Sequence, residues 1–74
     1  MTTGIYISIG KVIATKRKKL GLTQQDLAGD ADMERSYISA VENGHKNIQV
    51  DTLIRLASAL QMKPHKLLEE ALKI

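Results

Sequence analysis

Three breaks divide this 74-residue chain into short segments, and within the segments the apolar residues recur at helical spacing. The breaks are Gly21, Gly44 and Pro64, residue types that commonly mark the ends or beginnings of helices. The clearest periodic set, at i, i+3, i+4 and i+7, consists of Leu53, Leu56, Ala57 and Leu60. This spacing places four apolar side chains on one helical face and predicts an amphipathic helix over residues 51–60. We therefore expect an all-α fold made of short helices.

The amino-terminal segment has two competing patterns. Ile5, Ile7 and Ile9 alternate with more polar residues, as in a strand. The apolar residues also fit one helical face, which consists of Ile5, Ile9, Ile13 and Leu20. We expect the helix, over residues 5–19, with Gly21 as its left-handed cap and the Lys and Arg side chains of its last turn complementing the helix dipole.

Capping signals predict the other helices. The Thr23 hydroxyl can cap free amides at a helix start, and Asp26 three residues later favours the positive end of the dipole. The remaining helices are expected over residues 24–30, from Glu34 to Asn43-Gly44, and from Pro64 onward. A turn over residues 31–33 separates the first two of these. The prediction is one compact five-helix domain over residues 1–74.

The composition excludes several protein classes. The chain has no Cys, so it has no disulfide framework or thiolate metal site, and it fits a reducing cytoplasm. No apolar run approaches the roughly 18 residues of a membrane span, and the first ten residues lack the features of a signal peptide. We expect a whole mature protein in the cytoplasm, with no membrane partner. Its small core leaves a narrow margin of stability that a second copy would widen.

The charges are separated along the chain. Eleven Lys and Arg against eight Asp and Glu give a net charge of +3, which suggests an anionic partner. The basic cluster is Lys11, Lys16, Arg17, Lys18 and Lys19, and the acidic cluster that follows is Asp26, Asp30, Asp32 and Glu34. A solvated helix face explains the basic cluster about as well as a binding surface does.

The second and third predicted helices are joined by only three or four residues, which is helix-turn-helix spacing. The residues expected to face the core are Leu27, Ala31, Met33, Ile38 and Val41, with Ala28 at the closest helix approach. The opposite face of the third helix presents Arg35, Ser36, Tyr37, Ser39, Ala40 and Asn43. These small or hydrogen-bonding side chains suit entry into a DNA groove.

With these motifs the chain resembles the lambda-repressor-like, or Xre-type, helix-turn-helix regulators. The matching runs include Lys19-Leu20-Gly21-Leu22-Thr23-Gln24, Leu27-Ala28, Tyr37-Ile38-Ser39, Val41-Glu42 and Leu56-Ala57. The runs Arg35-Ser36-Tyr37-Ile38-Ser39 and Lys46-Asn47-Ile48 look most like the small controller proteins of restriction-modification systems. The resemblance implies a dimeric regulator that binds double-stranded operator DNA and sets the timing of restriction-modification gene expression. RNA polymerase is a further candidate partner.

Two positions depart from the family pattern. Asp32 stands where glycine is usual in the turn, and aspartate tolerates left-handed geometry better than most residues. Glu34 stands where a short capping residue is common, and its charge lies near the entry to the groove. The resemblance also implies that Arg17 pairs with Glu42 inside the fold.

The resemblance assigns DNA contacts to eight residues. They are Gln24, Arg35, Ser36, Tyr37, Ser39, Asn43, Lys46 and Asn47. Arg35 is the first candidate for reading a base, because its fork fits the O6 and N7 acceptors of guanine. An ion pair with Glu34, Asp32 or Glu42 is the alternative. Lys46, with Asn47 and His45, lies in the loop where a cation can contact the flanking phosphate.

Other assignments have two interpretations. Gln24 either stands where neighbouring backbone amides bind a DNA phosphate, or is only a capping residue. Tyr37 contacts the DNA backbone or a thymine methyl, or its ring packs on the scaffold. Ser39 and Asn43 donate to phosphate or serve as surface and cap residues.

The carboxy-terminal third holds more apolar residues than the small core has room for. The surplus residues are Ile48, Val50, Ile54, Leu68, Leu72 and Ile74. An exposed apolar patch marks an interface, so we expect a homodimer through the fourth and fifth helices, with Leu68 or Leu72 alternatively turned inward. A two-fold pair would bind a pseudo-palindromic operator with half-sites about 10 bp apart.

An enzyme is not expected. His45 and His65 are the only histidines, and without cysteine or suitably spaced carboxylates they predict no metal site. No phosphate-binding glycine motif is present, and no serine has a histidine placed as its base, so no catalytic residue, cofactor or small-molecule ligand is expected. The alternative function is an antitoxin-type or phage or chromosomal repressor that also engages a protein partner, although little chain is left after Leu72 to bind a toxin.

Overall fold

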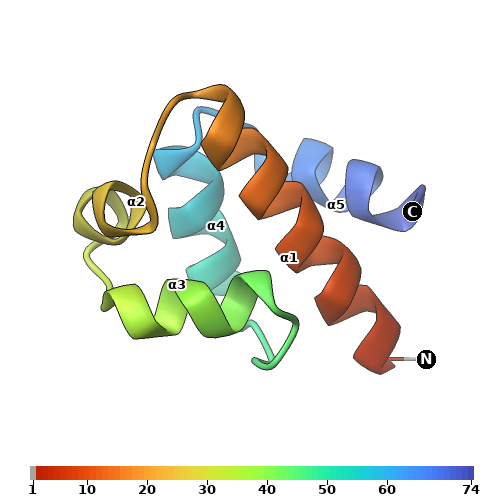
Figure 1. Cartoon of the computed structure of the whole chain (residues 1–74). Helices are drawn as coiled ribbons and strands as arrows, with labels where there is room; N and C mark the ends of the chain where they lie inside the picture. Colours follow the sequence, from red (N-terminus) through yellow and green to blue (C-terminus); the bar gives the residue numbers. More distant parts are fainter. Residues whose placement is uncertain (1) are drawn as a thin grey trace.

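The computed structural model describes residues 2–74, with side chains from Gly4 onward. These residues form five helices, as Figure 1 shows. Their bounds are α1 Thr2–Lys19, α2 Gln24–Ala31, α3 Arg35–Glu42, α4 Val50–Ala59 and α5 Pro64–Leu72. The all-α fold predicted from the sequence is confirmed, and the amino-terminal segment is helical, not a strand. The predicted boundaries differ by one to three residues, since helix ends carry weaker signals than helix centres.

Four of the helices end in the same backbone motif, in which a residue after the last turn adopts a left-handed conformation. These residues are Gly21, Asp32, Gly44 and Gln61, with φ between 58° and 75°. At the end of α2, the Asp32 N–H donates to the Gly29 carbonyl at 3.3 Å and the Met33 N–H donates to the Ala28 carbonyl at 2.8 Å. This pattern satisfies carbonyls that a helix end leaves free. Glycine was expected at two of the sites, whereas nothing in the sequence marked Gln61.

The predicted cap of α2 is present as a reciprocal capping box. The Thr23 hydroxyl accepts from the Asp26 N–H at 3.0 Å, and the Asp26 carboxylate accepts from the Thr23 N–H at 2.9 Å. These hydrogen bonds lower the pKa of Asp26 below its ordinary value. The stabilisation is therefore present above the ordinary pKa and is lost as the pH falls through the lowered pKa.

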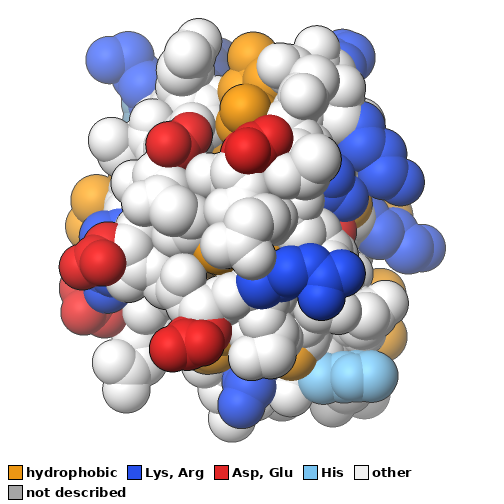
Figure 2. Space-filling model, turned by 60° about the vertical axis from the view of Figure 1, so that its left-hand side comes forward, with side chains coloured by type: hydrophobic (Ala, Val, Ile, Leu, Met, Phe, Trp, Pro, Cys, Tyr) orange, Lys and Arg blue, Asp and Glu red, His pale blue; other side chains and the backbone are white. Residues whose placement is uncertain are grey.

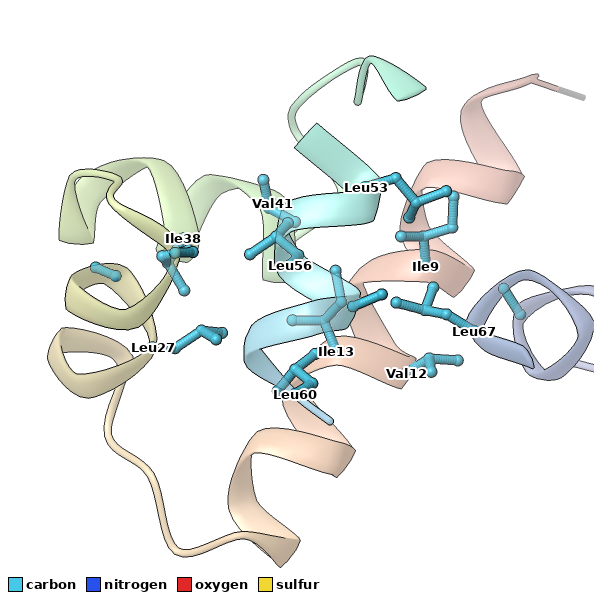
Figure 3. Close-up of a cluster of buried hydrophobic side chains, with 14 residues drawn as sticks. Ile9, Val12, Ile13, Leu27, Ile38, Val41, Leu53, Leu56, Leu60 and Leu67 are labelled. Atoms are coloured by element: carbon cyan, nitrogen blue, oxygen red, sulfur yellow. The ribbon is translucent and has the colours of Figure 1, made fainter. Parts of the chain in front are cut away.

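One apolar core joins all five helices, and its side chains converge between them in Figure 3. The fully buried large side chains are Ile13, Leu27, Ile38, Leu56, Leu60, Leu67 and Val41. All four members of the periodic set on α4 are buried, as its spacing predicted. Ile5, Leu20 and Met33 pack against the core but stay partly exposed. Burial of α3 through Ile38 and Val41 leaves its other face outward.

Gly10 sets the close approach of α1 to α3. A Cβ atom at this position would lie 2.4 Å from the Val41 carbonyl oxygen and 2.7 Å from that of Glu42. Only glycine therefore lets the two backbones meet at this separation. The position of α3 depends on this contact.

Candidate nucleic-acid interface

Helices α2 and α3 form a helix-turn-helix at one side of the molecule, remote from α5 (Figure 1). Helix α3 packs against α1 and α2. The polar residues predicted on its outer face are Arg35, Ser36 and Asn43, which are exposed, and Tyr37 and Ser39, which are half-buried. A helix packed in this way exposes one polar face. The major groove of DNA is wide enough to admit an α-helix.

An ion pair fixes the carboxy-terminal end of α3. Arg17 Nε lies 2.6 Å from Glu42 Oε2, and Arg17 Nη2 donates to Glu42 Oε1 at 3.1 Å. Arg17 Nη1 also donates to the Leu22 carbonyl at 2.8 Å. The hydrogen bond to Glu42 raises the pKa of Arg17 above its ordinary value. The expected pairing of Arg17 with Glu42 is confirmed, and it joins α1, the loop before α2, and α3.

Gln24 joins the same network. Its amide nitrogen donates to Glu42 Oε1 at 3.1 Å, whereas the capping hydrogen bond of α2 comes from Thr23. The side chain of Gln24 is thus held by α3, an arrangement that neither interpretation from the sequence included. This hydrogen bond fixes the first turn of α2 against the end of α3.

The side chains at the start of α3 and after its end are free to meet a ligand. Among the described residues, Arg35 forms no ion pair, so its alternative role as a partner of an acidic neighbour is not found. Lys46 Nζ lies 5.8 Å from the centroid of the Tyr37 ring, within the range of a cation–π interaction. Asn47 is exposed beside Lys46. Two of the predicted contact residues, Tyr37 and Lys46, are therefore brought together.

Asn43 has a local structural role. Its side-chain amide donates to the Ser39 carbonyl at 2.9 Å, and its backbone ends α3. The Ser39 carbonyl also accepts from the Asn43 backbone N–H at 3.1 Å, so Asn43 binds this carbonyl twice. The predicted cap role of Asn43 is present, and its contact with DNA stays a prediction.

Charge is unevenly distributed over the surface. On the face shown in Figure 2, most Lys and Arg side chains lie in the right-hand half, and the Asp and Glu side chains lie on the left and across the upper middle. Lys and Arg side chains also lie at the upper left and beside the acidic side chains on the left, so the division on this face is partial. Such a division orients an approaching polyanion.

The comparisons with known proteins identify the family. A helix-turn-helix family model matches residues 13–67. The chain belongs to the Xre-type helix-turn-helix family. It is 34% identical to the control protein C.BamHI of Bacillus amyloliquefaciens over 70 residues, which cover 93% of this chain and 86% of the relative. The relatives of this chain therefore include control proteins, the subfamily suggested by the sequence motifs.

Solved structures agree with this assignment. The restriction-modification controller protein C.AhdI of Aeromonas hydrophila has a TM-score of 0.81 and 32% identity, covering 84% of this chain and 94% of that protein. The controller protein C.Esp1396I, solved as a tetramer in complex with its natural 35 base-pair operator, has a TM-score of 0.84 and 28% identity, covering 93% and 91%. The predicted five-helix lambda-repressor-like architecture is confirmed.

This Xre-type protein exposes apolar side chains near its carboxy terminus. Val50 is 72% exposed and Leu72 is 74% exposed, and Ile54 and Ile74 are also exposed. Ile48 and Leu68, the other members of the predicted dimer surface, are half-buried and pack against the core. A further exposed apolar residue is Ile7, which the expected helical face of Ile5, Ile9, Ile13 and Leu20 did not include.

Sequence reasoning missed Arg55. From α4, its Nη2 atom donates to the carbonyls of Ala31 and Asp32, each at 2.7 Å. The two hydrogen bonds join residues that are 24 and 23 positions apart. No local spacing in the sequence predicts contacts over such separations. The unusual Asp32 in the turn was the only sign that the turn needs support from elsewhere.

Two further findings concern the described residues alone. None of the helices within residues 2–74 is long and apolar enough to cross a membrane. Nor does that part of the chain bring together three or more His, Asp or Glu side chains in a group that could hold a metal ion.

Proposed function

We propose that this chain is a transcription regulator that binds double-stranded operator DNA as a homodimer and controls restriction-modification genes. The observation that carries the proposal is the outward polar face of α3, with Lys46 in the loop that follows. The kinship with controller proteins supports it, and one of these relatives is solved on its natural operator. The single-domain organisation over residues 1–74, the cytoplasmic location and a contact with RNA polymerase stay predictions.

The proposed binding mode divides the contacts between bases and phosphates. Arg35, in the first turn of α3, reads guanine through its fork of donors. Ser36, Tyr37 and Ser39 on α3, and Asn43 at its C-cap, contact the DNA in the same groove. Lys46 and Asn47 hold the flanking phosphate after α3, while the amides beside Gln24 meet a phosphate at the start of α2. Phosphate contacts set the register, and base contacts set the sequence preference.

Replacing Arg35 and Lys46 with alanine separates these two roles. Arg35→Ala should weaken binding to the preferred duplex by roughly 1–3 kcal/mol and relax the preference at one base pair. Lys46→Ala should weaken binding to all duplexes about equally and reduce the slope of log K against log salt concentration by about 0.9. Selection from random DNA supplies the duplex, and fluorescence anisotropy over a salt series measures both effects.

Lys63→Ala is the matched control, because it removes an exposed positive charge at the start of α5, outside the proposed interface. It should leave the base preference unchanged. A uniform loss of affinity for all sequences in Arg35→Ala would reduce Arg35 to a phosphate contact. Binding no tighter than millimolar to every duplex at low salt would refute the DNA-binding function.

The proposed dimer is formed by α4 and α5 through Ile48, Val50, Ile54, Leu68, Leu72 and Ile74. Ile54→Lys should convert the protein to a monomer at micromolar concentration, because the two-fold axis brings two buried charges together without a partner. Sedimentation velocity measures the change. Gln25→Lys, at an exposed polar position on α2 and outside the proposed dimer surface, should leave the dimer intact. A wild-type monomer that binds one half-site undiminished would refute the dimer.

A further inference from the structure

The turn between α2 and α3 is held from outside by a single side chain. Arg55 projects from α4, which packs against α2, and its Nη2 atom donates at 2.7 Å both to the Ala31 carbonyl and to the Asp32 carbonyl. Hydrogen bonds from a charged donor are shorter and stronger than those between neutral groups. Figure 1 shows α4 beside the α2–α3 pair, so this contact joins the turn to the centre of the fold.

The turn lacks two of the usual local supports. Asp32 adopts a left-handed conformation with φ 58°, which costs energy for any residue with a side chain. Glu34, the cap of α3, forms no side-chain hydrogen bond to the helix. The backbone bonds of the turn engage the carbonyls of Ala28 and Gly29. The carbonyls of Ala31, the last residue of α2, and of Asp32, in the turn, are instead the ones that Arg55 binds.

We propose that Arg55 is a positioning residue. It sets the orientation of the first turn of α3 and, with it, the direction of the base-reading side chain of Arg35. This inference rests on the proposed function. Arg35 follows Asp32 by only three residues, so a rotation of the turn displaces its guanidinium group directly. The far end of α3 is fixed independently by Arg17 and Glu42. Loss of the Arg55 contact therefore frees one end of the recognition helix and leaves the other in place.

Because only the first turn of α3 is freed, the loss of Arg55 should weaken base contacts more than phosphate contacts. Bidentate contact with a guanine edge requires close alignment of two donors with two acceptors. A phosphate contact by Lys46 depends mainly on charge and tolerates small displacements. Removal of Arg55 should lower the affinity for the preferred duplex more than the affinity for unrelated duplexes. A role in general stability would change the melting temperature and leave the ratio of the two affinities unchanged.

The test uses Arg55→Met, which keeps most of the aliphatic stem and removes the donors, and Arg55→Lys, which keeps a charged donor. Lys63→Met is the matched control for the loss of one exposed positive charge. Affinities for the selected duplex and for a scrambled duplex of equal length are measured at a temperature where circular dichroism shows each variant to be folded. We expect the specificity ratio to fall about tenfold in Arg55→Met, to recover in part in Arg55→Lys, and to stay unchanged in Lys63→Met.

The outcomes separate this inference from the function on which it rests. A wild-type protein without preference for any duplex would overturn the proposed function and the role of Arg55 with it. A wild-type preference that Arg55→Met retains in full would overturn only the role of Arg55, whatever its melting temperature. A ratio that falls equally in Lys63→Met would attribute the effect to net charge and would also overturn the inference.

Discussion

Replacing Glu42 with alanine should lower the free energy of unfolding by about 3 kcal/mol, because it leaves a nearly buried guanidinium group without its partner. The side chains of Arg17 and Glu42 are only 11% and 7% exposed. The carboxylate also accepts from Gln24, so α1 and α2 both lose their hydrogen bonds to α3 at this site. Urea denaturation followed by circular dichroism measures the loss.

A second ion pair in the same chain supplies the control. Lys66 and Glu69 lie 3.4 Å apart with their side chains 60% and 53% exposed, and exposed pairs of this kind contribute little. Glu69→Ala should therefore change the stability by less than about 0.5 kcal/mol. If Glu42→Ala cost no more than Glu69→Ala, the Arg17–Glu42 pair would have no part in holding α3.

Replacing Gly10 with alanine should destabilise the protein by roughly 2–3 kcal/mol, since a core that is already filled resists added volume. The new methyl group would lie 2.4 Å from the Val41 carbonyl oxygen, and backbone cannot move aside as a flexible side chain can. Helix α3 would have to shift away from α1. Thermal and urea denaturation measure the stability, and anisotropy with the selected duplex measures the effect on the recognition helix.

Gly29→Ala is the matched substitution. Gly29 lies within α2, and a Cβ atom there meets nothing within 4 Å. Alanine at this site should stabilise the protein by about 0.5–1 kcal/mol, because glycine loses more backbone freedom on entering a helix. Equal and favourable effects of the two substitutions would contradict the close packing of α1 on α3.

The sequence by itself determined the helices and most of their ends. The apolar spacing of Leu53, Leu56 and Leu60 and the capping pair Thr23 and Asp26 were sufficient, because both patterns involve contacts within one or two helical turns. The family motifs added the Arg17–Glu42 pair and the candidate reading face of α3. The likeness to controller proteins followed from the same residues, since they lie in register along almost the whole chain.

Only the tertiary structure decided which surplus apolar residues face outward and what holds the recognition helix. Periodicity assigns a residue to a face of its own helix, but the neighbouring helices determine whether that face is covered. Ile48 and Leu68 are half-buried for this reason, while Val50 and Leu72 are exposed. The contact of Gly10 with Val41 and the reach of Arg55 to Asp32 join residues more than 20 positions apart. Local sequence patterns do not predict contacts between residues so far apart in the chain, because the packing of whole helices against one another determines these contacts.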